Sequence, residues 1–263
     1  MKRTLFLFLF FLNIGFSIYV GNPSEPILLK NSIIKNYNSN FSLEISYLQD
    51  YIYRSQFQDK FESLQSTPSD IKILSYLSIL TLNIINRIDI NILLGSSDLK
   101  VDRLIKTKNN FSYGLGLKAI LFNKKDFDIG FDFKYFTSTF KPTYFVVDDE
   151  DDGTIIYDII GSFKQRYEEY IGSLLISYKT PLLTPYIGAS FIYADLTPKP
   201  SVGKIFIPEV GEYPFVTSDS KIKDNFGMVI GVSIINLNKQ INLSIENRLF
   251  NQNAISATLQ IRY

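Results

Sequence analysis

The stretch from Phe111 to Tyr135, FSYGLGLKAILFNKKDFDIGFDFKY, decides the fold. Every second residue from Phe111 to Leu121 is apolar, and most residues between them are small or polar. The pattern restarts at Phe127, after the polar turn at 123–126, and continues to Tyr135. Because successive side chains of a strand point to opposite faces, each run has one apolar face and one polar face. The stretch therefore predicts two antiparallel strands joined by a short turn.

The same period-two pattern recurs along most of the chain. Clear runs lie at 41–47, 88–94, 226–234, 241–245 and 255–263. Weaker runs, with apolar residues on both faces in places, lie at 76–85, 170–179 and 186–195. Together with the first two, these runs predict about ten strands, each near the ~9–11 residues that a tilted membrane strand needs.

The connections between these runs alternate in length. Short turns are expected near 86–87, 123–126, 180–184 and 236–240, and long polar connections at 53–73, 97–110, 141–166 and 197–223. The last connection, 251–253, falls at a long-loop position but is short. This alternation predicts an all-β fold, an antiparallel up-and-down transmembrane β-barrel with short periplasmic turns and long extracellular loops.

A soluble β-sandwich also alternates, because it buries its apolar faces between two sheets. Three features favour a membrane barrel: polar faces rich in Gly, Ser and mixed charges, long uniform strands, and aromatic residues near the strand ends on the apolar side. These aromatic residues are Tyr113, Phe127, Tyr135, Tyr170, Tyr178, Tyr193, Phe226 and Tyr263.

The chain begins like an exported protein. A basic start, Met1-Lys2-Arg3, precedes an apolar run rich in Leu and Phe, and Gly15-Phe16-Ser17 supplies small residues for cleavage after Ser17. We expect residues 1–17 to be a cleaved signal peptide, 18–40 a short periplasmic segment and 41–263 the barrel. The alternative at the start is an uncleaved anchor. Residues 25–40 stay open between a short helix, a plug and an extra strand.

Composition excludes several kinds of chemistry. The 263 residues include no His and no Cys, and the formal net charge is +1. A Ser-His-Asp triad, a Cys-His pair or a thiolate or histidine metal site cannot be built from them. We therefore expect no enzyme activity, no cofactor and no metal, and the charge balance points to no nucleic-acid partner.

With its export signal and its alternating last strand that ends on an aromatic residue, the chain resembles the small outer-membrane β-barrel proteins of diderm bacteria. The resemblance is architectural and implies a bacterial outer-membrane location. It also implies that the last strand is read by the barrel-assembly machinery. That strand presents Ile255, Ala257, Leu259, Ile261 and Tyr263 on one face. Enzymes of this architecture, such as the omptin proteases, depend on histidine, which this chain lacks.

Nine ionisable residues are expected to face the lumen of the barrel. They line an ion pathway in one interpretation and form a salt-bridge network that fills the lumen in the other. Ten strands lie nearer the filled end of the barrel size range, so we favour the filled lumen. The nine are Glu44, Asp89, Lys118, Asp128, Asp132, Lys134, Glu246, Arg248 and Arg262.

The long connections carry the remaining candidates. The run 148–153 imitates part of a calcium loop but has Ile159 where a bidentate Glu is needed, so a solvated loop tip is favoured. Lys100, Arg103, Lys106 and Lys108 make another loop basic, either to bind anionic headgroups or glycans, or as ordinary surface charge. The long connection at 197–223 carries apolar residues among its prolines, and it is either a site for a protein partner or an extension of the barrel wall.

The function expected from the sequence is that of a non-catalytic, surface-exposed barrel in contact with outer-membrane lipid, with loops for interaction or adhesion with host or envelope proteins. The alternative is a narrow porin for ions or small solutes.

Overall fold

The structure is a computed structural model. It describes residues 19–29, 41–59, 69–101, 105–107, 109–142, 144–149, 153–161, 164–199, 203–207, 211–215, 219–236 and 238–262. The expected signal peptide at 1–17 and the aromatic Tyr263 lie outside these residues.

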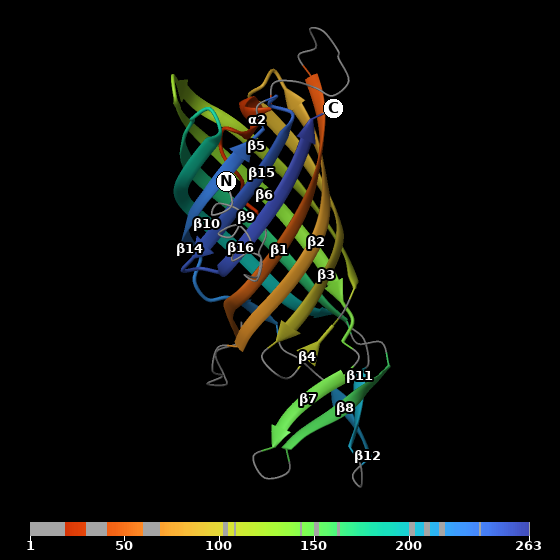
Figure 1. Cartoon of the computed structure of the whole chain (residues 1–263). Coiled ribbons are helices and arrows are strands. Elements are labelled where there is room, and N and C mark those ends of the chain that lie inside the picture. Colours follow the sequence, from red (N-terminus) through yellow and green to blue (C-terminus); the bar gives the residue numbers. More distant parts are fainter. Residues whose placement is uncertain are drawn as a thin grey trace, which may run out of the picture.

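Ten antiparallel strands form a closed barrel (Figure 1), which confirms the fold class and the expected strand number. Around the barrel they are β1 (Phe41–Asp59), β2 (Ser69–Ile84), β3 (Ile88–Val101), β5 (Asn110–Lys124), β6 (Phe127–Phe140), β9 (Lys164–Tyr178), β10 (Leu183–Lys199), β14 (Phe226–Ile235), β15 (Ile241–Leu249) and β16 (Asn253–Arg262).

Pairing of the first and last strands closes the sheet. Ile45 of β1 lies opposite Ile261 of β16 on one side and opposite Leu80 of β2 on the other. Closure leaves no barrel strand with an unpaired edge, which is the condition for β-structure in a lipid bilayer. The register between β1 and β16 shifts between Ile52 and Arg54, where β1 bulges.

Two ends of the barrel differ. The connections β2–β3, β5–β6, β9–β10 and β14–β15 are short and lie at one end, together with helix α2 (Glu25–Leu28) and the C-terminus (Figure 1). The opposite end carries the long connections, and we refer to these as the short-turn end and the long-loop end.

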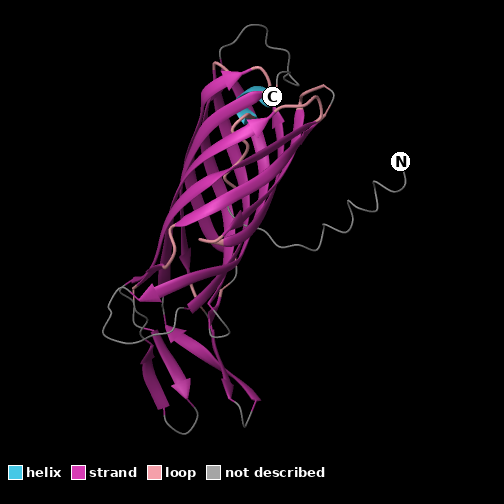
Figure 2. Ribbon diagram, turned by 90° about the vertical axis from the view of Figure 1, so that its left-hand side faces the viewer, coloured by secondary structure: helices cyan, strands magenta, loops and turns pink. Residues whose placement is uncertain are grey.

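Several strands lie within regions expected to be polar loops. β4 (Ile105–Lys106) pairs with β3, and β7 (Tyr144–Asp149), β8 (Gly153–Gly161), β11 (Gly203–Ile207) and β12 (Gly211–Phe215) form a small sheet beyond the long-loop end (Figure 2). β13 (Ser220–Ile222) bridges β1 and β10. These connections form strands because the two halves of each hairpin pair their backbone N–H and C=O groups with one another. The strands β1 and β2 likewise continue into the region 53–73.

The outside of the barrel is apolar. Outward side chains such as Leu43, Ile45, Leu94, Leu115 and Ile187 are about half exposed, although they are large and hydrophobic. A continuous exposed apolar surface of this kind is rare on soluble monomers and typical of a lipid-facing wall.

Aromatic residues flank this apolar belt at both ends. Tyr135 and Tyr170 stack near the long-loop end with ring centroids 4.9 Å apart, and Phe127 and Tyr178 stack near the short-turn end at the same distance. The two levels are eight residues apart on β6. At ~3.3 Å per residue and a tilt of ~40°, this gives a belt of roughly 20 Å, close to the ~25 Å of a transmembrane barrel.

Among the described residues, we find no helix with the length and apolar character needed to cross a membrane.

Candidate functional site: a filled lumen

The first described segment, Tyr19–Leu29, lies inside the barrel. Its residues are almost all buried, including Val20, Asn22 and Ser24, and strands surround it on all sides. We expected a periplasmic segment at 18–40; the described part of it is instead held in the lumen. Residues 25–28 form the short helix α2, with Pro26 at its first turn, where a missing N–H costs nothing.

All nine ionisable residues expected to face the lumen are buried, with exposed fractions of 3% or less. They occupy inward positions of β1, β3, β5, β6, β15 and β16, as the alternation requires. The structure divides them into four groups, and Glu246 belongs to the second of these, because it binds the same stretch of the segment as Lys134 from the opposite wall.

The group nearest the short-turn end joins the first and last strands. The Nε of Arg262 donates to Glu44 Oε1 over 2.6 Å, and Gln260 donates to the same carboxylate. Arg262 also donates to the backbone oxygen of Pro26, so this pair contacts α2. Asp89 accepts a hydrogen bond from Asn83 Nδ2 over 2.5 Å. The same Asn83 amide also donates to the backbone oxygen of Pro26.

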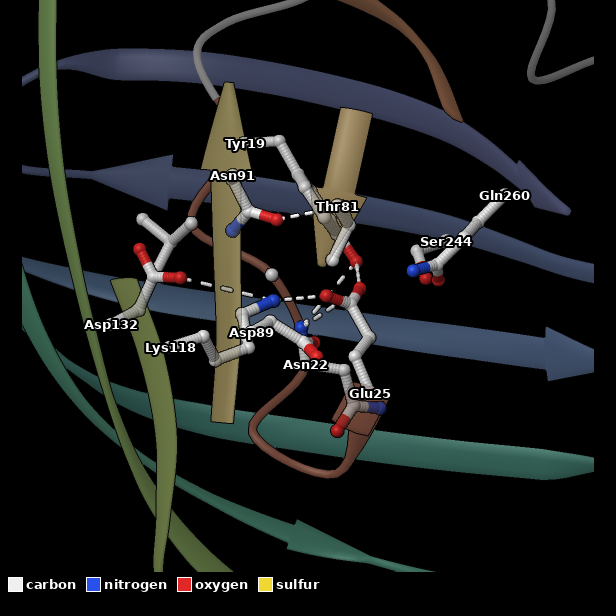
Figure 3. A network of polar contacts seen from close by, with 12 residues as sticks. Tyr19, Asn22, Glu25, Thr81, Asp89, Asn91, Lys118, Asp132, Ser244 and Gln260 are labelled. Carbon is white, nitrogen blue, oxygen red and sulfur yellow. Dashed lines mark hydrogen bonds and ion pairs between the residues drawn. The ribbon is translucent and has the colours of Figure 1, made fainter. Parts of the chain in front are cut away.

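A second group lies at the centre of the polar lumen (Figure 3). Lys118 forms an ion pair with Glu25 of the segment and lies 3.8 Å from Asp132. Lys134 pairs with Asp132 at 2.9 Å and donates to the backbone oxygens of Tyr19 and Val20 over 2.7 and 2.6 Å. The barrel wall therefore supplies cations to both a carboxylate and the main chain of the segment.

Glu246 binds the segment from the opposite wall. Its two carboxylate oxygens accept from the backbone N–H groups of Val20 and Gly21, both over 2.8 Å, and from the Tyr186 hydroxyl over 2.9 Å. Gly21 has φ +97°, and a Cβ there would lie 2.1 Å from Lys118 Nζ. Only glycine fits this left-handed position against the lysine.

Asp128 forms a third anchor near the short-turn end. It pairs with Lys179 at 2.9 Å and accepts hydrogen bonds from Asn123 and from the Ser24 hydroxyl of the segment. These contacts tie the segment to β6 and to the turn after β9.

The fourth group, around Arg248, is less well paired. Arg248 is fully buried, and its nearest carboxylate is that of Glu169, with a Glu169 Oε1 to Nη1 distance of 3.9 Å. None of the three guanidinium nitrogens has a hydrogen-bond partner among the described residues. Asp50 lies in the same region, where its Oδ1 accepts from Ser256.

Three lumen carboxylates were not among the expected nine. Glu25 precedes the first strand and so escaped the alternation. Asp50 continues the inward parity of β1, and extending that run would have found it. Glu169 lies on β9, whose register the sequence did not fix. Among the described residues, eight carboxylates and four basic side chains are buried: Glu25, Glu44, Asp50, Asp89, Asp128, Asp132, Glu169 and Glu246 against Lys118, Lys134, Arg248 and Arg262.

Apolar side chains fill the lumen toward the long-loop end. The ring of Tyr167 on β9 lies 6.3 Å from Phe57 on β1, 6.3 Å from Phe136 and 6.4 Å from Phe140 on β6. β1 and β9 are opposite one another in the ten-strand order, so this aromatic cluster spans the barrel. Further inward members include Leu48, Ile52, Ile71, Ile73, Leu99, Ile171, Ile192, Leu196 and Val229.

The described lumen contains a small opening among its charged side chains. One cavity of about 20 Å³ lies between Tyr19, Glu25, Asp89, Lys118 and Lys134. A cavity of this size accommodates about one water molecule. Among the described residues, no three Asp or Glu side chains are placed to hold a metal ion.

A closed, ten-stranded barrel with an apolar outer belt and a packed interior defines the transmembrane β-barrel class of protein. Several solved structures of similar shape are bacterial outer-membrane β-barrels. The translocator domain of the autotransporter NalP from Neisseria meningitidis is 9% identical over 88% of this chain and 90% of its own, with a TM-score of 0.45.

Two further similar structures are a protease and a channel. The outer-membrane protease OmpT from Escherichia coli is 13% identical over 87% of this chain and 96% of its own, with a TM-score of 0.43. An outer-membrane channel from Pseudomonas putida is 12% identical over 89% of this chain and 99% of its own, with a TM-score of 0.40. These similarities concern barrel shape and carry no argument about activity.

No protein-family model and no curated protein matches the sequence.

Proposed function

We propose that the protein is an integral, non-catalytic β-barrel of the bacterial outer membrane, with a closed lumen and an interaction surface at its long-loop end. The outward apolar belt and its two aromatic levels support the membrane location. The expected export signal at 1–17 and the assembly strand 255–263 support the outer membrane in particular.

The observation that carries this proposal is the double filling of the lumen. The segment Tyr19–Leu29 occupies the short-turn half, and the aromatic cluster around Tyr167 spans the long-loop half. A solute would have to displace both, because each is buried within its part of the lumen. The interaction surface is then left to the long connections, which carry the small sheet of β7, β8, β11 and β12.

A narrow pore is the second candidate. The excess of buried carboxylates over buried basic side chains in the described residues favours it, since a lumen with net negative charge would pass cations. Such a pore needs the segment to leave the lumen for at least part of the time.

Single-channel recording in planar bilayers tests the closed lumen. The refolded mature protein, with its barrel verified by heat-dependent gel mobility, should give no steady openings at high salt and at either polarity. Steady cation-selective openings would reject the closed lumen and establish the pore.

The orientation of the barrel has its own test. A short epitope inserted in the β1–β2 connection at 60–68 should be labelled by antibody on intact cells, whereas one inserted at the Asn123–Asp126 turn should be labelled only after the membrane is opened. The reverse pattern would place the long-loop end in the periplasm and remove the proposed interaction surface.

A further inference from the structure

The rim of the barrel at the long-loop end contains a polar cavity of about 160 Å³. It is lined by Arg54, Gln56, Asp224, Phe250, Asn251 and Asn253. These residues come from β1, from the connection before β14 and from the tight turn between β15 and β16, so three separate parts of the chain converge on it.

Three unusual local features of the chain meet at this cavity. β1 bulges between Ile52 and Arg54, and this shift places Arg54 opposite Asn253. Phe250 has φ +79°, a conformation that a bulky residue adopts only under constraint. Bulges and strained residues of this kind are common next to binding sites, where they redirect a side chain.

The third feature is the close approach of the Asn251 side chain to Gly227. Asn251 is buried, and its amide donates to Ser190 Oγ over 3.3 Å and to the backbone oxygen of Asn225 over 3.2 Å. A Cβ at Gly227 would lie 2.2 Å from Asn251 Oδ1, so glycine is what lets this side chain enter. A buried, hydrogen-bonded amide at Asn251 and an aromatic ring at Phe250, which is 72% exposed, therefore both line the cavity.

The lining chemistry suits a neutral, hydroxyl-rich ligand. Amides accept from and donate to paired hydroxyls, and a carboxylate accepts from them in a planar geometry. Arg54, whose Nε donates to Asp70 over 3.4 Å, adds guanidinium donors beside them. Arg54 is paired with Asp70 outside the lining at 3.4 Å, and Asp224 is the anion of the lining, so no excess positive charge is left to attract a phosphate. The electron-rich face of the Phe250 ring can cover the C–H face of a sugar.

We propose that this cavity is a binding site for a neutral saccharide. The cavity is smaller than the ~300 Å³ at which pockets for drug-sized ligands begin, so one sugar ring is the unit it takes. The inference rests on the proposed function to this extent: the long-loop end must face the outside of the cell for glycans to reach it.

Saturation-transfer-difference NMR on the full mature protein in lipid nanodiscs tests the site. The probes are galactose, glucose and lactose, with N-acetylneuraminic acid and glucosamine as charged counterparts. At least one neutral sugar should show transfer to its ring protons, and the charged probes should show less.

Two variants locate the binding. Phe250→Gly removes the ring and at the same time relieves the positive φ, so the barrel stays folded; it should weaken binding at least fivefold. Asp224→Asn, at an exposed position, should do the same. Phe226→Ala is the matched control, because Phe226 is 75% exposed at the same end but does not line the cavity.

No transfer to any neutral sugar, stronger transfer to a charged probe, or equal binding by the Phe250→Gly variant would each overturn the assignment. Conductance of the same preparation separates the two proposals. A closed barrel without sugar binding rejects only the saccharide site, and an open pore rejects only the closed lumen.

Discussion

The ion pair between Lys118 of β5 and Glu25 of the lumen segment offers the sharpest test of the filled lumen. Both side chains are buried, and Asp132 at 3.8 Å is the only other carboxylate paired with Lys118 among the described residues. Replacing Lys118 by Met leaves Glu25 with the Tyr19 hydroxyl and the Asn22 N–H as partners, and with no cation.

Breaking a buried ion pair by removing one partner costs about 3–5 kcal/mol, because the remaining charge stays in a low dielectric. Lys118→Met and Glu25→Gln should each lower the free energy of unfolding by about this amount. The double variant should cost less than the sum, with a coupling of about 1–3 kcal/mol. Lys124→Met, at an exposed position at the end of the same strand, is the matched control and should change stability by less than about 0.5 kcal/mol.

Urea titration of the refolded barrel in lipid vesicles, read by gel mobility, measures the global stability. Limited proteolysis, read by mass spectrometry of the segment 19–29, reports whether the segment leaves the lumen before the barrel unfolds. Additive single variants, or a cost of less than about 1 kcal/mol for Lys118→Met with the segment still protected, would refute the reasoning that this pair holds the segment.

Three further predictions concern the same architecture. Gly21→Ala should destabilise the protein by about 1–3 kcal/mol through its positive φ and its clash with Lys118, whereas Gly172→Ala, where a Cβ meets nothing within 4 Å, should be near neutral; urea midpoints compare the two. Leu117→Arg in the middle of the apolar belt should cost about 2–4 kcal/mol in a bilayer and Phe111→Arg near its edge about 0–1 kcal/mol, and equal costs would contradict a lipid-facing wall. Tyr263→Ala should reduce the fraction of heat-modifiable barrel assembled in cells, and unchanged assembly would remove Tyr263 from the assembly signal.

Alternation predicted the barrel because most strands carry polar residues inward and apolar residues outward. β5 as far as Ala119 and the first half of β6 follow this rule, and their hairpin alone defines the strand period, the turn and the lipid face. The same rule placed the nine lumen residues, since parity alone assigns each to the inner face.

The rule weakens where the lumen itself is apolar. β9 and β10 carry Tyr167, Ile171 and Ile192 inward and large apolar residues outward, so both faces read alike and the register could not be fixed from sequence. The segment 19–29 was missed for a different reason. Its sequence has no period, and its place is set by partners more than 90 residues away, such as Lys118 and Glu246.

The two halves of the lumen are closed by different interactions, and this difference has a consequence for how the barrel behaves. The short-turn half depends on a separable piece of chain, which the wall binds through Lys118, Lys134, Asp128 and Glu246. The long-loop half depends on side chains of the wall itself, packed around Tyr167 across the full width of the barrel. Release of the segment therefore exposes a polar cup open at the short-turn end, while the aromatic cluster continues to close the other mouth. Continuous conduction requires both closures to fail. Tyr19 and Val20 of the segment belong to the same buried apolar cluster as Tyr167, so the contacts of the two closures are joined at these residues.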